Sequence, residues 1–364
     1  MGWLRSRYGW AWLAIFASLP LLVLSLPVLS SGFDYWPAQA LARNVRYGDS
    51  FLFAYPLPVY LPFAPLGVLA DPWPRLLAPV ICAAFLGPGL WLWGARRVVL
   101  VAALVSPVAV GVLVNSNFST AVAVFGVGLA TWAKRSGHHP LVGLGVALGL
   151  WRPANTLPVI LVLLASGWRW RQLLEAVAAG ALFLLPITAL AFLYQPDWLA
   201  TYRQIIGGYA GLAGLGPHLL TLLGPLGYAA AELAVAAAGL WILRRRSLAD
   251  AAAFALALTV LLAPAEGAYG GALALPAVIR AAQEPRYVAL PALAGLIGWG
   301  IAFALLTVNF PVGVVGYWFV LQAYPLLRKG GEAARASTAV NGERSAPGSS
   351  TALVAAGSSG TREG

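Results

Sequence analysis

Apolar runs recur along almost the whole chain and constrain its fold more than any other feature of the sequence. Several approach the roughly 20 residues that a membrane-spanning helix needs, and the Pro and Gly inside them are better tolerated in lipid than in water. Hydrophobic residues make up 60% of the 364 residues and charged residues only 10%, against about 25% in soluble domains. The strand-type alternation of a β-barrel is lacking. The sequence therefore predicts an all-α polytopic membrane protein.

The net charge of +11 is interpreted as a consequence of topology. Cytoplasmic loops of membrane proteins collect Lys and Arg, so we expect membrane lipids, and no nucleic acid, as partners of the basic surface. Cys82 is the only cysteine, and a disulfide within the chain or a Cys-based metal site is therefore excluded. The residues before Gly32 do not form an Ala-x-Ala cleavage site, which favours an uncleaved first helix.

Basic clusters between the apolar runs set the predicted topology. A helix over 9–30 leaves the N-terminus in the cytoplasm and carries Asp34 to the outside. Four prolines between Pro56 and Pro65 argue against a regular span over 51–70, so 32–74 is predicted as one long external loop. The Gly- and Ser-rich residues 330–364 are predicted to be a disordered cytoplasmic tail, and residues 1–329 the transmembrane domain.

The remaining apolar runs then give a bundle of about 10–12 transmembrane helices, with both termini cytoplasmic, in the plasma membrane. Most basic residues before the tail fall on the inner side in this threading, as the positive-inside rule requires. The expected helices after the loop span 76–94, 98–114, 118–133, 140–151, 154–167, 173–194, 219–243, 250–264, 269–281, 287–306 and 310–327.

Two of these helices, 140–151 and 154–167, are too short to cross the bilayer. Twelve helical residues cover only about 18 Å, against a hydrocarbon core of about 30 Å. Arg152, between them, should therefore lie below the outer surface. A cation at that depth is costly in lipid and should face a cavity or a partner, which predicts a polar cleft open to the outside.

The predicted outer side combines carboxylates, arginines and aromatic residues. Aromatic rings can stack on sugar rings, arginines bind phosphate oxygens bidentately, and a carboxylate can take a proton from an attacking hydroxyl. This combination suits a sugar joined to a phosphate, although ordinary external loops contain such residues as well. The residues concerned are Asp34, Asp49, Asp71, Asp197, Glu266, Arg43, Arg46, Arg152, Arg203, Tyr35, Trp36, Tyr47 and Tyr55.

The loop segment "GFDYWPAQALARNVRYGDSFLFAYPLPVYLPFAPL", residues 32–66, resembles the first external loop of GT-C superfamily glycosyltransferases that use polyprenyl-phosphate donors. It is closest to the mannosyl- and arabinofuranosyltransferase-like family GT87. A second block, residues 115–170, is similar to the Asn-containing outer turn, small-residue helix and Lys-Pro step of that family. The matching steps are Asp34-Tyr35, Tyr47-Gly48, Tyr55-Pro56 with Pro58, Pro65-Leu66, and Arg152-Pro153 in place of Lys-Pro.

The resemblance implies a GT-C-like fold and a membrane hexosyl- or pentosyltransferase, such as a mannosyltransferase, of the cell envelope. It would move a sugar from polyprenyl phosphate to a glycolipid or glycan acceptor on the outer face, with inversion. Asp34 is the implied general base, and Arg152 is the candidate for the donor phosphate. The implied substrate pocket consists of Tyr35, Tyr55, Asn115, Asn117, Glu266 and Tyr269. No protein metal ligand is predicted, and a divalent cation is left open as a cofactor.

Two alternatives from other classes stay open: a lipid or solute transporter or flippase, because short Pro- and Gly-interrupted helices are also transporter features, and an inactive GT-C-like scaffold. Glu232 lies within an expected span, where an acid is either functional or forms a hydrogen bond between helices, to Tyr228 or a neighbour. The pair His138-His139 is interpreted as part of a charged turn, and residues 207–217 as an external or interfacial segment.

Overall fold

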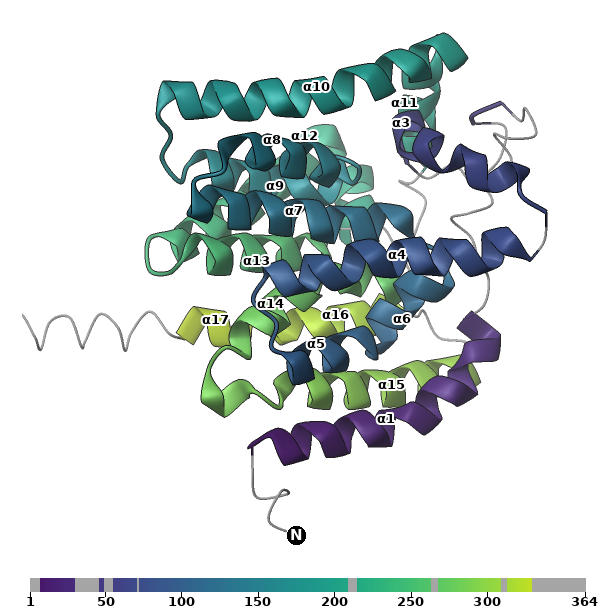
Figure 1. Ribbon diagram of the computed structural model, residues 1–364, viewed down its shortest axis with the longest axis vertical. Helices are drawn as coiled ribbons and strands as arrows, with labels where there is room; N and C mark the ends of the chain where they lie inside the picture. Colours follow the sequence, from purple (N-terminus) through teal and green to yellow (C-terminus); the bar gives the residue numbers. More distant parts are fainter. Residues whose placement is uncertain are drawn as a thin grey trace, which may run out of the picture. The chain divides into compact units, whose positions relative to one another are not determined.

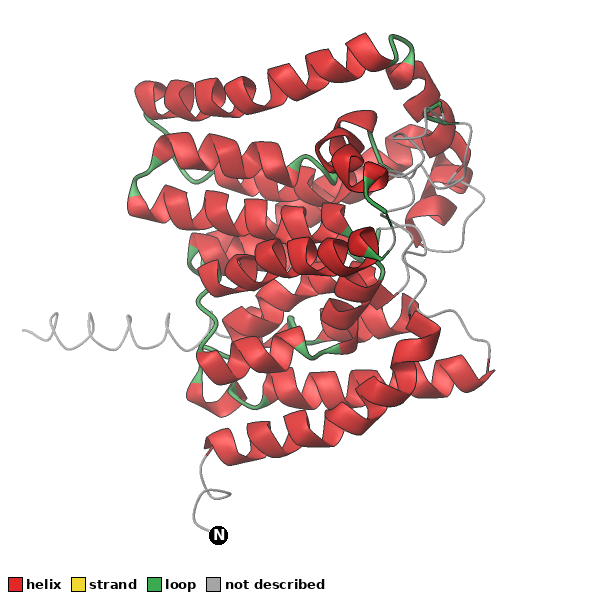
Figure 2. Ribbon diagram, turned by 45° about the vertical axis from the view of Figure 1, so that its right-hand side comes forward, coloured by secondary structure: helices red, strands yellow, loops and turns green. Residues whose placement is uncertain are grey.

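Helix boundaries in this protein coincide with capping and breaking residues. The computed structural model describes residues 7–29, 46–48, 55–70, 72–208, 215–262, 268–308 and 313–328, and within these ranges all regular structure is helical (Figure 2). Helix α7 (Phe118–Ser136), for example, begins after Asn117, whose side chain accepts a hydrogen bond from the Thr120 amide. It ends at Gly137, which has a φ of 78° that favours glycine.

The described elements are all helices (Figure 1). In chain order they are α1 (Arg7–Leu29), α3 (Leu57–Tyr60), η2 (Leu61–Val68), α4 (Trp73–Leu92), α5 (Arg97–Leu104), α6 (Pro107–Val114), α7, α8 (His139–Gly149), α9 (Pro153–Leu164), α10 (Trp170–Tyr194), α11 (Trp198–Gly208), α12 (Leu215–Leu243), α13 (Leu248–Thr259), η4 (Ala268–Ala274), α14 (Leu275–Ala281), η5 (Pro285–Tyr287), α15 (Leu290–Val308), α16 (Gly313–Leu321) and α17 (Tyr324–Arg328).

Four segments are long and apolar enough to cross a bilayer by themselves: Trp73–Leu92, Trp170–Tyr194, Thr221–Leu243 and Pro285–Leu305. A fifth span results if the bent pair of α5 and α6 is counted as one. The described part of the chain is thus that of an all-helical membrane protein. Several shorter apolar helices accompany these spans, and the expected number of 10–12 crossings stays a prediction.

Several expected helices are broken or change type, among them 269–281, which forms η4 and α14, and 310–327, which forms α16 and α17. The run 98–114 forms two helices that meet at an angle of 60°, so the expectation of one continuous helix was wrong there. Pro107 lacks a backbone N–H and begins α6, and the Ser106 hydroxyl accepts a hydrogen bond from the Ala109 amide at 3.4 Å. Helix α12 is also interrupted, at Gly224, just before Pro225.

The proline-rich segment of the predicted external loop has no regular span, as expected. Its described residues 55–70 form one turn of α-helix, α3, followed by the 3₁₀ helix η2. Helix α11 was not anticipated. The predicted catalytic part of the loop around Asp34 and the predicted tail 330–364 lie outside the described residues.

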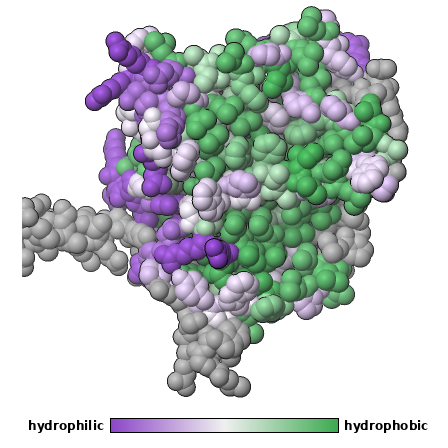
Figure 3. Space-filling model, viewed as in Figure 1, coloured by the Kyte–Doolittle hydropathy of each residue, from purple (hydrophilic) through white to green (hydrophobic). Residues whose placement is uncertain are grey.

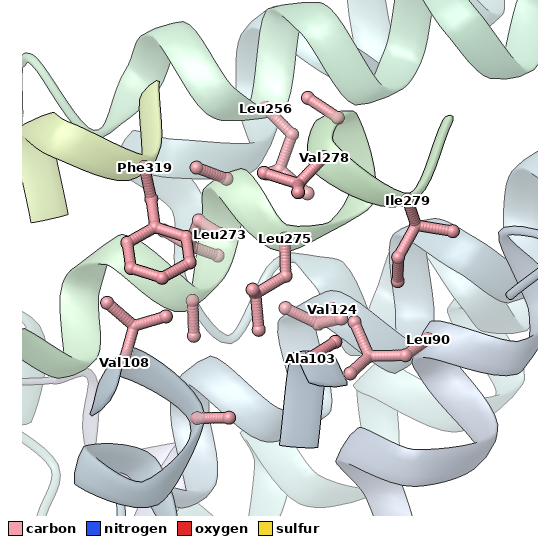
Figure 4. Close-up of a cluster of buried hydrophobic side chains, with 14 of the residues drawn as sticks. Leu90, Ala103, Val108, Val124, Leu256, Leu273, Leu275, Val278, Ile279 and Phe319 are labelled. Atoms are coloured by element: carbon pink, nitrogen blue, oxygen red, sulfur yellow. The ribbon is translucent and has the colours of Figure 1, made fainter. Parts of the chain in front are cut away.

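The interior of the helical unit, Met1–Leu327, is centred on η4 and α14. Figure 4 shows side chains of this segment, among them Leu273, Leu275 and Val278, surrounded by Leu256 of α13 and Phe319 of α16. All five are at most 1% exposed. Because lipid tails are as apolar as these side chains, close van der Waals packing rather than hydrophobic transfer holds such helices together in a bilayer.

The turns between helices gather at two opposite ends of the helical unit. At one end, the Lys134 ammonium donates to Gly167 O, Arg280 pairs with Asp250, and Arg96 donates to Tyr8. These contacts join turns that were all predicted to be cytoplasmic, and hydrophilic residues concentrate at this end in Figure 3, beside a largely hydrophobic flank. The predicted segregation of basic turns to one end is thus present in the structure. Which end faces the cytoplasm stays a prediction.

Candidate functional site

Arg152 lies at the opposite end, in the turn between α8 and α9. Arg152 is only 2% exposed. Its Nη1 donates a hydrogen bond to the hydroxyl of Thr120, in the first turn of α7. Since α7 begins at Phe118 and α9 at Pro153, the guanidinium lies beside the N-terminal ends of two helices. Helix N-termini carry partial positive charge. The partial charges of the two helix ends and the charge of the guanidinium together favour the binding of an anion here.

Tyr55 covers one side of the guanidinium. Its ring centroid is 5.4 Å from Arg152 Cζ, within the range of a cation–π contact. The Tyr55 hydroxyl accepts a hydrogen bond from Asn117 Nδ2 at 3.3 Å. Tyr55, Asn117 and Arg152, three residues predicted to share a pocket, are therefore neighbours in the structure.

The turn 115–117 between α6 and α7 explains why Asn117 points toward Tyr55. Ser116 has a φ of 55°, a left-handed conformation that reverses the chain within one residue. Asn115 Nδ2 donates back to Gly111 O at 2.9 Å, while Asn117 Oδ1 accepts from the Thr120 amide at 2.9 Å. Both asparagines thus cap helices, and Asn117 also reaches Tyr55.

The described pieces of the predicted external loop are fastened to the junction of α10 and α11. The Tyr47 amide donates to Gln195 Oε1 at 3.0 Å and Gln195 Nε2 donates to Tyr47 O at 3.3 Å. Arg46 forms an ion pair with Asp197. The Tyr47 hydroxyl then donates to Tyr55 O at 2.7 Å. Gln195, which is distant in sequence, thus holds Tyr47, and Tyr47 in turn holds Tyr55 in its position over Arg152.

Helix α11 adds a site residue that sequence reasoning missed. Tyr202 packs against the aromatic cluster of Tyr47, Tyr60 and Trp198, to which Tyr55 is also adjacent. Burial raises the pKa of Tyr202 to about 12, while the nearby positive charge of Arg152 acts in the opposite direction. A signal was present in the sequence, because Trp198, Tyr202 and Ile205, which join the same cluster, have the i, i+4, i+7 spacing of an amphipathic helix.

Buried polar groups continue inward from Arg152. The Thr156 hydroxyl donates to Arg152 O at 3.0 Å, and Asn155 Nδ2 lies 3.4 Å from the hydroxyl oxygen of Thr259 at the end of α13. All four residues are at most 4% exposed. Polar groups buried among apolar helices are costly unless hydrogen-bonded, and this row links α7, α9 and α13 behind the arginine.

The other predicted site residues are not placed by the structure. Asp34, Tyr35 and Glu266 lie outside the described residues, and Tyr269 is described only as part of the backbone of η4. Among the described residues, no three His, Cys, Asp or Glu side chains are grouped so that they could hold a metal ion.

The remaining sequence candidates lie away from Arg152. His138 and His139 lie at the basic end, where their rings approach Trp132 at 5.7 Å and Trp168 at 5.9 Å. Glu232 is hydrogen-bonded to Tyr228, one turn earlier on α12. This agrees with the second of the two interpretations of Glu232, that of a hydrogen-bonded acid, although the bond lies within one helix. Comparison of the chain with protein-family models, with curated proteins and with solved structures finds no match.

Proposed function

We propose that this chain is a membrane glycosyltransferase of the GT-C type, which transfers a sugar from a polyprenyl-phosphate donor to a glycolipid or glycan acceptor of the cell envelope. The observation that carries the proposal is the buried Arg152 at the ends of α7 and α9, covered by Tyr55. A phosphate attached to a membrane lipid can reach a cation among apolar helices more readily than a soluble nucleotide sugar can. The aromatic residues beside the cation suit the sugar.

In the proposed reaction, the acceptor hydroxyl attacks the anomeric carbon of the donor sugar. The bond between that carbon and the phosphate oxygen breaks, the phosphate leaves with the electron pair, and the configuration inverts. Arg152 stabilises the charge that develops on the leaving phosphate. Asp34 takes the proton of the hydroxyl, so that a second carboxylate as nucleophile is not required.

A transporter or flippase is the second candidate, and the broken helices favour it. The 60° bend between α5 and α6 and the interruption of α12 at Gly224 are interruptions of the kind that transporters use at their binding sites. An inactive GT-C-like scaffold is the third. These classes differ in what happens to a lipid-linked sugar, and one assay can therefore separate them.

The test uses the purified full-length chain in liposomes that contain undecaprenyl-phosphate-linked mannose or arabinofuranose, labelled in the sugar, and an envelope lipid extract as acceptor source. Transfer of label to the extract by the wild type, with loss in Arg152→Ala, supports the proposal. Movement of the intact donor between leaflets without cleavage would favour the flippase. Neither activity with either sugar would favour the scaffold.

A further inference from the structure

The aromatic cluster beside Arg152 contains a phenol group that the proposed reaction leaves unused, that of Tyr202. This residue lies on α11 and packs with Tyr60 and Trp198. Tyr55, whose ring centroid is 5.4 Å from Arg152 Cζ, packs against the same cluster, and the charge of Arg152 lowers the pKa of the Tyr202 phenol against the effect of burial. A cationic side chain, Arg152, and a neutral one, Tyr202, thus act on each other although they are 50 residues apart in the sequence.

The hydroxyl of Tyr202 differs from those of the neighbouring tyrosines. The Tyr47 hydroxyl donates to Tyr55 O, and the Tyr60 hydroxyl accepts from the Tyr55 amide at 3.0 Å. Within the described ranges, the Tyr202 hydroxyl forms no hydrogen bond. With a pKa of about 12, the phenol keeps its proton at neutral pH. Tyr202 is half-buried, so its hydroxyl is available to donate to a ligand.

Helix α11 is held firmly enough to keep this donor in place. Besides the contacts of Gln195 and Asp197, a Cβ added to Gly48 would lie 2.2 Å from Thr201 Cγ2, so the backbone of segment 46–48 touches α11 directly. Gly48 also has a φ of 96°. Tyr202 follows Thr201 in the chain, and the segment that carries Tyr55 toward Arg152 therefore also fixes Tyr202.

We propose that Tyr202 is a second anion-binding residue of the Arg152 site, and that its hydroxyl donates a hydrogen bond to the phosphate group which Arg152 binds. The inference rests on the proposed function, because that function supplies the phosphate. One guanidinium and one neutral phenol fit a phosphodiester with a single negative charge, in which two non-bridging oxygens are available. The chemical class of ligand is therefore a lipid-linked phosphodiester.

The experiment measures binding of farnesyl methyl phosphate, a prenyl phosphodiester without a sugar, to the full-length protein in detergent. Farnesol, which lacks the phosphate, is the uncharged counterpart. Tyr202→Phe removes only the hydroxyl. Tyr324→Phe removes the same group at the opposite end of the helical unit and serves as the matched control.

We expect Tyr202→Phe to bind the phosphodiester about tenfold or more weakly, the usual effect of losing a hydrogen bond to a charged group. Farnesol binding should be unchanged in both variants. A purely structural role of the hydroxyl would alter both ligands equally. If Tyr202→Phe does not fold, the pair Tyr202→Gln and Tyr202→Leu replaces it, since only Gln keeps a donor.

Two failures are distinguishable. Wild-type affinity of Tyr202→Phe for the phosphodiester, together with strong loss in Arg152→Ala, would overturn the role of Tyr202 and leave the proposed site intact. Undiminished binding by Arg152→Ala, or no preference of the wild type for the phosphodiester over farnesol, would overturn the phosphate site and the inference with it.

Discussion

Arg152 has an unusual position for a cation in an apolar chain. It lies beside two helix N-termini, whose partial positive charge repels it, while the Thr120 hydroxyl accepts a hydrogen bond from its guanidinium and the Tyr55 ring covers it. Structural arginines are better placed near helix C-termini. An arginine held at the unfavourable end of two helices makes sense if an anion completes the site.

Arg152→Ala should therefore abolish or strongly weaken binding of the lipid phosphate, with little loss of thermal stability. Lys should restore binding in part, since a point charge attracts phosphate without the bidentate geometry of the guanidinium. The measurement is the affinity for farnesyl methyl phosphate beside the unfolding midpoint of each variant. A large drop in midpoint for both variants would instead assign Arg152 a structural role.

Asp34 stays the predicted general base, on the argument from the resemblance. Asp34→Asn should fold and bind donor normally but transfer sugar about 10²–10⁴-fold more slowly, the usual contribution of a positioned base. Asn caps a helix about as well as Asp, so a capping role predicts almost unchanged transfer. Near wild-type transfer would move the catalytic assignment to another acid, such as Asp49 or Glu266.

At this scale, the sequence was informative where a residue type conflicts with its surroundings. Arg152 could be predicted because a charge between two helices too short to span is conspicuous. Tyr202 could not be predicted in the same way, because a tyrosine in a polar-looking stretch conflicts with nothing. Its role depends on α11 folding back on segment 46–48, a contact between residues more than a hundred positions apart that no local pattern records.

Helix α8 shows how short elements are held in this fold. A Cβ on Gly143 would lie 1.7 Å from Ala176 O of α10, and one on Gly145 would lie 2.5 Å from Gly126 O of α7. The backbones of three helices are therefore in direct contact. Small residues are the usual means by which membrane helices approach this closely, and here they fix the short helix that precedes Arg152.

Gly143→Ala should force α8 and α10 apart and lower the free energy of unfolding by about 1–3 kcal/mol, the usual cost of overpacking. Gly300→Ala is the matched control, because a Cβ there meets no atom within 4 Å and alanine is the better helix former. Thermal unfolding in detergent measures both. Equal midpoints for the two variants would contradict the close contact of α8 with α10.

Element by element, apolar runs and basic turns predicted most helices to within a few residues, because several helices begin at a proline or a capping side chain and α7 ends with Lys134 and Arg135 in its last turn. The errors occurred where a local helix-start or helix-face signal was present but was given less weight than the apolar or polar character of the surrounding stretch. Ser106-Pro107 is a helix start inside an apolar run, and the run was interpreted as continuous. Helix α11 was missed because the helix is short and follows directly after the polar residues Gln195-Pro196-Asp197, which were interpreted as part of an external loop.

At the scale of the whole helical unit, chemistry is divided between the two ends. One end holds the turns α7–α8 and α12–α13 and the end of α14, and the other holds the turn α8–α9 (Figure 1). Lys134, Arg245 and Arg280 belong to the first end, and Arg152 belongs to the second. The positive-inside rule assigns the first end to the cytoplasm. We therefore predict that the candidate site faces outside, where under the proposed function a lipid-linked sugar would have to be delivered by a separate flipping step.

This orientation can be tested with single cysteines in a Cys82→Ser background. Asp197→Cys lies at the end of the candidate site, and Arg245→Cys lies at the basic end; both native side chains are exposed. In intact cells, an impermeant thiol reagent should label position 197 and spare position 245, and both should react after detergent treatment. Labelling of 245 alone would reverse the orientation and place the site in the cytoplasm. There the donor could be loaded without flipping, and the proposed direction of transfer would be wrong.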